Sequence, residues 1–153
     1  MYNFDHTLLP WMGKINKEFT FLVQTSFEQN NIDLTRHQWL VLKKLDENDG
    51  QIQNNLAFIT DRDKTSLTRL INTMERKDLV TRRADTNDKR VNKIFITDKG
   101  SNILSSSLPI MKELINVMQR GLSNEELTNT IATLKAVREN LENSLLKREN
   151  QLT

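Results

Sequence analysis

A chain of 153 residues, 37% of them apolar and 27% charged, is long enough for one folded domain and too short for two independent enzyme domains. Because it contains no cysteine, disulfides, thiolate zinc sites, iron-sulfur clusters and thiol redox switches are excluded. The first residues lack the basic segment and apolar core of a secretory leader, and no apolar run approaches the roughly 18 residues of a spanning helix. We therefore expect a cytoplasmic protein without a membrane partner.

The positive charge of the chain is concentrated in one segment. The formal net charge is only +2, yet residues 62–93 hold ten Lys or Arg against five Asp or Glu. Such a segment often does no more than solvate the fold. Its concentration in one place is also what a nucleic-acid site requires.

Two helices are predicted in the first third of the chain. From Leu8 to Val23 the apolar residues recur with the period of a helix, and Pro10 suits its first turn. A polar break follows, and Thr35 with Gln38 three residues later has the spacing of a capping box that begins a second helix. That helix should end near residues 46–50.

The middle of the chain predicts two further helices and a hairpin. Residues 53–60 read as a short helix, and residues 61–78 as a longer one with Leu67, Leu70, Ile71 and Met74 on its inner face. An alternating run opens at Leu79, residues 84–88 supply turn residues, and residues 93–97 return, which predicts a two-stranded hairpin. Because a lone hairpin is unstable, it should pack on the preceding helix.

Two long helices are predicted in the last third. The first continues past residue 103 to Met118, with Pro109 expected to kink it. The second begins at a capping box of Ser123 and Glu126 and places several leucines on one face. The terminal helices carry more apolar surface than a domain of this size covers, which favours a homodimer. The alternative is a monomeric bundle in which these helices cover one another.

The predicted short helix, turn and longer helix have the order of a helix-turn-helix, whose second helix can enter the major groove of double-stranded DNA. Arg can bind guanine, Asn can pair with adenine, and Thr can bond a base or touch the thymine methyl. An ordinary solvated helix face is the alternative. The candidate base-reading residues, on the outer face, are Lys64, Thr65, Ser66, Thr68, Arg69 and Asn72.

The basic hairpin decides between these readings, because a hairpin placed directly after such a helix can act as a wing. Lys89 and Arg90 lie at its tip, where they would meet the narrow minor groove. The remaining basic residues of its arms would contact the phosphate backbone, and these are Arg82, Arg83 and Lys93.

The order and spacing of several segments resemble the multiple antibiotic resistance regulator (MarR) family. These segments are "DKTSLTRLI", "LVTRR", "DTNDKR" and "TDKG", and the flanking helices resemble the dimerisation helices of the family. The resemblance implies a mainly α fold with a small β-hairpin wing. It makes residues 34–97 a winged helix-turn-helix DNA-binding domain, and residues 1–33 and 98–153 a helical dimerisation region.

The resemblance also implies a function. It indicates a homodimeric transcriptional regulator, usually a repressor, which binds a pseudo-palindromic operator and is released by a small molecule. Asp88 is then expected to orient Arg90 through an ion pair. The chain departs from the family pattern at Asp78, where glycine is frequent, at Thr60 and Asp61, where Leu-Gly is usual, and at Ile52, where a serine cap is common.

An effector pocket is implied between the dimerisation helices and the winged domain. An apolar lining favours an aromatic or lipophilic effector, although for any single one of these residues a plain core position is the better expectation. The candidate lining residues are Trp11, Met12, Ile15, Phe19, Trp39 and Met111.

Other classes of function have weaker signals. His6 and His37 lack the spacing of a metal pair, so neither a metal nor a cofactor is expected. The serines at 105–107 have no predicted activating base, and we expect no enzyme activity. The main alternative is a helical dimer that acts as a protein-interaction module or antirepressor without specific DNA binding.

Overall fold

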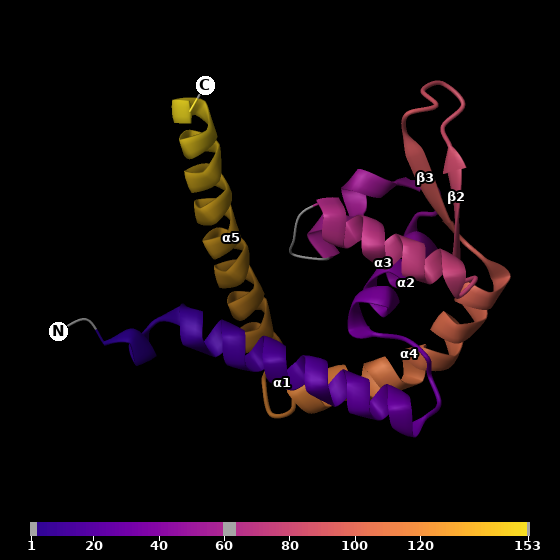
Figure 1. Cartoon of the computed structure of the whole chain (residues 1–153). Coiled ribbons are helices and arrows are strands. Elements are labelled where there is room, and N and C mark those ends of the chain that lie inside the picture. The colour runs from indigo at the N-terminus through magenta and orange to yellow at the C-terminus, as the bar shows by residue number, and fades with distance from the viewer. Residues whose placement is uncertain (1–2, 60–63, 153) are drawn as a thin grey trace. The chain divides into compact units, whose positions relative to one another are not determined.

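The computed structural model describes residues 3–59 and 64–152 (Figure 1). The predicted fold class, mainly α with a small β-sheet wing, is confirmed. The chain divides into two compact units at Leu114, which are described separately below. In chain order the elements are the 3-10 helix η1 (Phe4–His6), α1 (Leu8–Gln29), α2 (Arg36–Glu47), β1 (Gln51–Ile52), the 3-10 helix η2 (Gln53–Ile59), α3 (Lys64–Arg76), β2 (Val80–Ala84), β3 (Asn92–Ile96), α4 (Asp98–Met118) and α5 (Asn124–Leu152).

Local capping signals fix the starts of two helices as predicted. The Thr35 hydroxyl accepts the backbone N–H of Gln38 at 3.2 Å, and the Gln38 side chain accepts the backbone N–H of Thr35 at 3.0 Å. Ser123 and Glu126 form the same reciprocal pair ahead of α5, at 3.2 and 2.7 Å. Each pair satisfies two backbone donors that the first turn of a helix leaves open.

Helix α3 ends in a Schellman motif centred on Asp78. Asp78 has a φ of 58°, the left-handed conformation expected where the family usually has glycine. The backbone N–H of Leu79 donates to the Met74 carbonyl at 2.9 Å, and that of Asp78 donates to the Glu75 carbonyl at 2.9 Å. Since Met74 and Leu79 are both buried, the motif turns the chain directly from α3 into the sheet.

The sheet has three strands rather than the two predicted. Its order is β1-β3-β2, with both pairings antiparallel, and β3 lies between the other two. In β1, Gln51 pairs with Ile94 and Ile52 with Lys93 of β3. Strand β2 pairs with β3 along its whole length, with Val80 opposite Ile96. The two-stranded hairpin prediction was therefore incomplete. The third strand, β1, joins a sheet edge that the hairpin alone would leave open.

Two other predictions changed in detail. Helix α1 extends to Gln29 rather than ending at Val23, because Phe27 in its last turns is fully buried in the core. The short helix predicted from residue 53 is a 3-10 helix. The departure noted at Thr60 and Asp61 lies outside the described residues.

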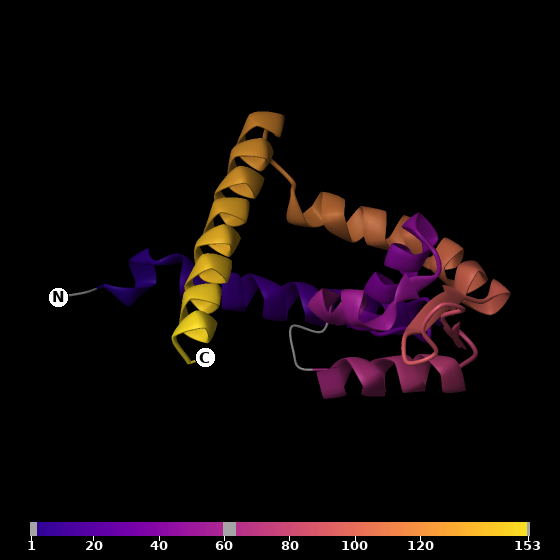
Figure 2. The ribbon, with the colours of Figure 1, turned by 90° about the horizontal axis from the view of Figure 1, so that it is seen from above.

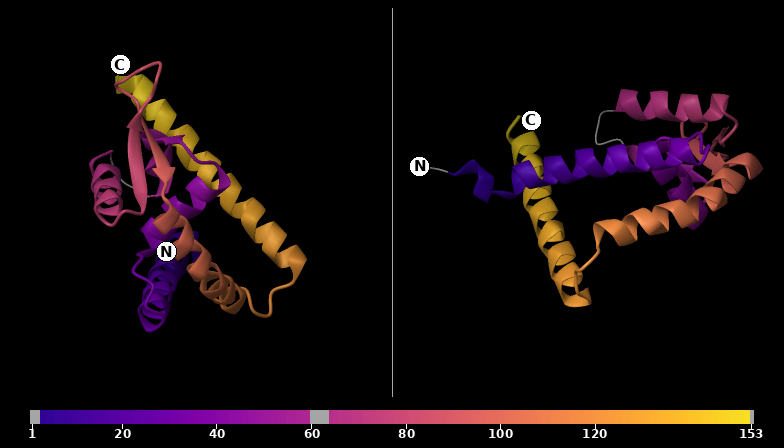
Figure 3. Two further views of the ribbon diagram at one scale, coloured as in Figure 1. Left: turned by 90° about the vertical axis from the view of Figure 1, so that its right-hand side faces the viewer. Right: turned by 90° about the horizontal axis from the view of Figure 1, so that it is seen from below.

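The first unit has a single core beneath α3 and the sheet. Figures 2 and 3 show α3 along one side of this unit and the first part of α4 along the opposite side. The core draws on α1, α2, η2, α3, the strands and α4. Its fully buried members include Val23, Phe27, Leu42, Leu45, Leu56, Leu67, Ile71, Met74, Ile94 and Leu104. Packing therefore holds α3 and the hairpin of β2 and β3 against the same helices.

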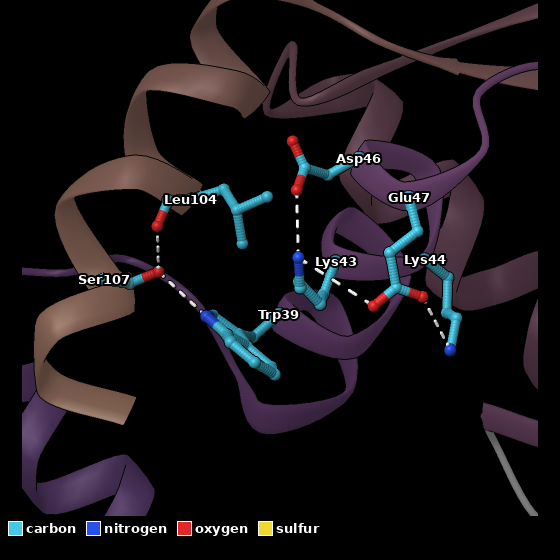
Figure 4. A network of polar contacts seen from close by, with 7 residues as sticks. All are labelled: Trp39, Lys43, Lys44, Asp46, Glu47, Leu104 and Ser107. Carbon is cyan, nitrogen blue, oxygen red and sulfur yellow. Dashed lines mark hydrogen bonds and ion pairs between the residues drawn. The ribbon is translucent and has the colours of Figure 1, made fainter. Parts of the chain in front are cut away.

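A buried hydrogen bond joins α2 to α4 in this core (Figure 4). The indole Nε1 of Trp39 donates to the Ser107 hydroxyl at 2.9 Å, and that hydroxyl donates to the Leu104 carbonyl at 2.6 Å. Ser107 is 0% exposed and Trp39 is 8% exposed. The only polar atom of the tryptophan side chain is thus satisfied inside an apolar core.

The second unit consists of the end of α4 and of α5, which carries exposed apolar side chains. Those of α5 include Ile131, Leu134, Leu141, Leu145 and Leu146. In the first unit, α1 likewise exposes Leu9, Trp11, Ile15 and Phe21. Among the described residues, no helix combines the length and apolar character needed to cross a bilayer.

Candidate nucleic-acid interface

Helix α3 buries one face and presents a polar one. Leu67, Ile71 and Met74 are fully buried, as the sequence predicts. The six candidate base-reading residues lie outside this buried stripe. Lys64, Thr65, Arg69 and Asn72 are exposed, whereas Ser66 and Thr68 are half-buried. The outer face bears cations, a hydroxyl and an amide, the side chains that read base edges in the major groove.

Thr68 and Asn72 lie one turn apart on α3 and are both hydrogen-bonded within the protein. The Thr68 hydroxyl donates to the Lys64 carbonyl at 2.9 Å and lies 3.3 Å from the Gln53 side-chain nitrogen. The Asn72 side-chain oxygen accepts from Arg82 Nη2 at 3.0 Å.

Arg82 of β2 is the centre of this polar network. Its Nε donates to the Gln53 side-chain oxygen at 3.0 Å, and its Nη1 lies 2.8 Å from Glu75 Oε2. Its backbone N–H donates to the other Glu75 oxygen at 3.0 Å. The side chain is only 23% exposed. Sequence reasoning placed Arg82 among the phosphate contacts, but in this structure its guanidinium binds acceptors of the protein itself.

The turn of the wing is built around the Asp85 carboxylate. It accepts the backbone N–H groups of Asn87 at 2.9 Å and Asp88 at 3.2 Å, and its other oxygen lies 2.5 Å from Lys93 Nζ. The hydrogen bond from Lys93, helped by those two N–H groups, lowers the pKa of Asp85 to about 2. Lys93, a predicted phosphate contact, is thus paired across the hairpin.

The expected ion pair between Asp88 and Arg90 is present at the tip. Arg90 Nε donates to Asp88 Oδ1 at 3.1 Å and Arg90 Nη2 to Asp88 Oδ2 at 3.3 Å, a two-pronged contact. This contact lowers the pKa of Asp88. The Arg90 side chain is 91% exposed, so the pair holds a cation outward at the tip.

The other two wing cations are exposed. Lys89 lies beside Arg90 in the loop, and the Arg83 guanidinium stands over the Phe95 ring at 4.8 Å from its centre. Figure 1 shows the loop between β2 and β3 extending beyond α3. The wing therefore offers three exposed cations, at Arg83, Lys89 and Arg90.

A cleft of about 340 Å³ separates the start of α3 from the wing. Among the described residues its lining is mainly polar and carries three cationic side chains, of which Arg82 and Arg90 are paired with Glu75 and Asp88. The lining residues are Ile52, Gln53, Asn54, Lys64, Thr68, Arg82, Arg90, Val91 and Asn92. Such a lining suits an anion, and a DNA phosphate is the anion that a helix and a wing would meet together.

The candidate effector residues do not share one environment. On α1, Trp11 is 56% exposed, Met12 and Ile15 are exposed, and Phe19 is half-buried. Trp39 and Met111 are buried in the core of the same unit. In the part of the chain that the structure describes, no group of three or more His, Asp or Glu side chains could hold a metal ion.

Comparisons with known proteins agree with this geometry. The family model described as the MarR family matches residues 34–91. The chain is 31% identical over 118 residues to the uncharacterized HTH-type transcriptional regulator YybA of Bacillus subtilis (strain 168), covering 77% of this chain and 79% of that protein.

Solved structures agree as well. A crystal structure of the transcriptional regulator SlyA has a TM-score of 0.77 at 27% identity and covers 90% of this chain and 95% of its own. The MepR-DNA complex of S. aureus has a TM-score of 0.76 at 25% identity, and the match covers 92% of this chain and 99% of the MepR chain. The winged fold, the polar recognition face and these relatives lead to one conclusion: the chain belongs to the MarR family of transcriptional regulators.

Proposed function

We propose that this regulator is a homodimeric repressor that binds a pseudo-palindromic operator in double-stranded DNA and leaves it when a small effector binds. The observation that carries the proposal is the pairing, in one compact unit, of a polar recognition face on α3 with a wing whose tip exposes cations. A relative that is 25% identical, S. aureus MepR, has been solved in complex with DNA.

In the proposed complex α3 lies in the major groove and the wing follows the adjacent backbone. Arg69, exposed on the outer face, would grip guanine through both O6 and N7. Arg90, held by Asp88, would enter the minor groove, where a narrow width strengthens the negative potential. Lys89, beside Arg90 at the tip, would face the same groove, and Arg83 would contact a phosphate.

The homodimer is supported by the apolar faces that α1 and α5 leave exposed. A two-fold dimer carries two recognition helices, so its half-sites should repeat at about one helical turn, roughly 10 base pairs centre to centre. Sedimentation at micromolar concentration showing only monomer would contradict this part of the proposal.

The proposed effector is an aromatic or lipophilic molecule. The exposed aromatic and aliphatic side chains of α1, with Trp11 the largest, offer such a molecule an apolar surface. A thermal-shift series with phenolic acids tests it, since a ligand that binds only the folded state raises the unfolding temperature. No stabilisation by any member would remove its support.

DNA binding is tested by fluorescence anisotropy. The purified protein is titrated into a duplex from immediately upstream of its own gene and into a scrambled duplex, each at two salt concentrations. We expect tight binding to the upstream duplex that weakens steeply with salt, because neutralised phosphates release counterions. Equal and weak binding to both duplexes would instead favour the protein-interaction alternative.

Two variants separate base reading from backbone contact. Arg69→Ala should cost about 1–3 kcal/mol on the operator and relax the preference at one base pair. Arg90→Ala should weaken operator and scrambled DNA more evenly. Arg138→Ala on α5 is the matched control, because it removes the same charge at a position where Arg138 pairs with Glu142 of its own helix. A loss with Arg90→Ala on the operator alone would contradict the role given to the wing.

A further inference from the structure

The orientation of the Asn72 amide is set by its partner. Asn72 is exposed on the outer face of α3, and its side-chain oxygen lies 3.0 Å from Arg82 Nη2. A guanidinium carries only donors, so it can face the oxygen of an amide but not its NH2 group. The Asn72 oxygen must therefore turn toward Arg82, which leaves the NH2 group to face outward.

Arg82 is itself held rigidly enough to impose that choice. Three of its five N–H donors bind Gln53, Asn72 and Glu75, and its own backbone N–H binds the second oxygen of Glu75. The Glu75 carboxylate also offsets the guanidinium charge. A side chain of β2 that is fixed at three points by two other elements, η2 and α3, has little freedom to turn toward a phosphate.

The same network decides whether the Thr68 hydroxyl, one turn earlier on α3, acts as a hydrogen-bond donor or acceptor toward DNA. The Gln53 oxygen accepts from Arg82, so the Gln53 NH2 group faces the Thr68 hydroxyl oxygen at 3.3 Å. The Thr68 hydroxyl proton is used on the Lys64 carbonyl at 2.9 Å. Thr68 can then offer a base only a lone pair and its methyl group, whereas Asn72 offers a donor.

We propose that Arg82 is a specificity-determining positioning residue, which makes α3 present a donor at Asn72 and an acceptor at Thr68. This inference rests on the proposed DNA-binding function. In the major groove guanine shows two acceptors, O6 and N7, thymine shows O4, and cytosine shows a donor, N4. The two-bond pairing of Asn with adenine needs the amide oxygen and nitrogen aimed together at the base. Asn72 should therefore select guanine or thymine, and not the adenine that an unconstrained Asn favours.

The test is selection of bound duplexes from a randomised library by the full-length protein. Wild type should enrich guanine or thymine at the base pair that Asn72 faces, and Asn72→Ala identifies that position because the preference disappears there. Arg82→Met frees the amide and should raise adenine at that position about tenfold over wild type. In Asn72→Ala/Arg82→Met the gain of adenine should be absent.

Arg83→Met is the matched control. It removes one cation from the same strand, but Arg83 lies over Phe95 and outside the network. It should weaken retention of every sequence while leaving the selected base pattern unchanged. A gain of adenine in Arg83→Met as large as in Arg82→Met would overturn the proposal, since loss of charge alone would then explain it.

Asn72→Asp keeps the proposal testable if Arg82→Met does not fold. This exposed, isosteric change keeps an acceptor for Arg82 and removes the outward donor, so the preference at that base pair should move to cytosine. Two results would overturn this inference but leave the proposed DNA-binding function standing. One is a wild type that already selects adenine at this base pair, and the other is an unchanged base preference in the variants of both Asn72 and Arg82. A wild type that enriches no sequence would overturn the proposed function, and the inference with it.

Discussion

The buried hydrogen bond between Trp39 and Ser107 makes a measurable prediction about stability. Ser107→Ala removes the acceptor of an indole N–H that lies 2.9 Å away in a core where Ser107 is 0% exposed. Leaving a buried donor unsatisfied costs about 1–3 kcal/mol of stability, and the better helix propensity of alanine offsets a few tenths of a kcal/mol of that loss. The expected net loss is therefore about 1–2 kcal/mol, or roughly 2–8 °C in the unfolding temperature of a chain of this size.

Urea unfolding at one fixed protein concentration measures this loss, because an oligomer would otherwise make stability depend on concentration. The midpoint should fall while the slope stays constant. Ser106→Ala is the matched control: it is the same change one residue earlier, where the exposed hydroxyl bonds only the Asn102 carbonyl of its own helix in the described contacts. Its effect should stay within about 0.5 kcal/mol.

A double-mutant cycle separates the hydrogen bond from simple loss of volume. Trp39→Phe removes the indole N–H. In that background Ser107→Ala leaves no buried donor without an acceptor, so it should cost about 1 kcal/mol less stability than in wild type. Equal costs for Ser107→Ala in both backgrounds, or a cost equal to that of Ser106→Ala, would refute this reasoning.

Two further predictions concern the wing and the packing of a glycine. The pKa of Asp85 is lowered to about 2, first by the Lys93 hydrogen bond. The ionised Asp85 carboxylate therefore stabilises the folded wing fully at a pH above the ordinary Asp pKa of about 3.9, and this stabilisation is lost as the pH falls toward about 2. Asp85→Asn should abolish that acid transition in the amide NMR shifts of the wing, and an unchanged transition would contradict the assignment. Gly100→Ala would place a Cβ 2.1 Å from the Leu79 carbonyl oxygen, so it should lower stability by about 1–3 kcal/mol or more. A Cβ at Gly13 would meet no atom of the described residues within 4 Å, so Gly13→Ala in the helix should raise stability by about 0.5–1 kcal/mol. Calorimetry measures both, and a Gly100→Ala protein as stable as wild type would show that the packing is misassigned.

The features that sequence predicted correctly depend on residues a few positions apart. A capping box predicts where a helix begins because its two residues lie within one turn of each other, as do Thr35 and Gln38 before α2 and Ser123 and Glu126 before α5. Asp78 was noted only as a departure from the family pattern, and the structure shows that it nevertheless takes the left-handed conformation. The ion pair of Asp88 with Arg90 spans two residues and was expected from the family resemblance.

The features that sequence missed depend on contacts between distant segments. Strand β1 is two residues long, too short to show a period, and its partners lie in β3 about 40 residues later. Arg82 was grouped with the phosphate contacts because it is basic, but one of its acceptors, Gln53, lies 29 residues earlier. Ser107 was considered only as a nucleophile, and its partner Trp39 lies 68 residues away. Nothing local in the sequence marks any of these pairings.

The central position of β3 has a consequence for how wings can diversify. Because β3 is paired on both edges, a residue inserted into the strand would shift two registers at once and turn its buried Ile94 outward. A residue inserted between Asp85 and Val91 disturbs neither register. The reach of the tip along DNA is therefore a length that insertions and deletions in this loop can adjust, while the base of the wing and the recognition helix packed on it stay constant.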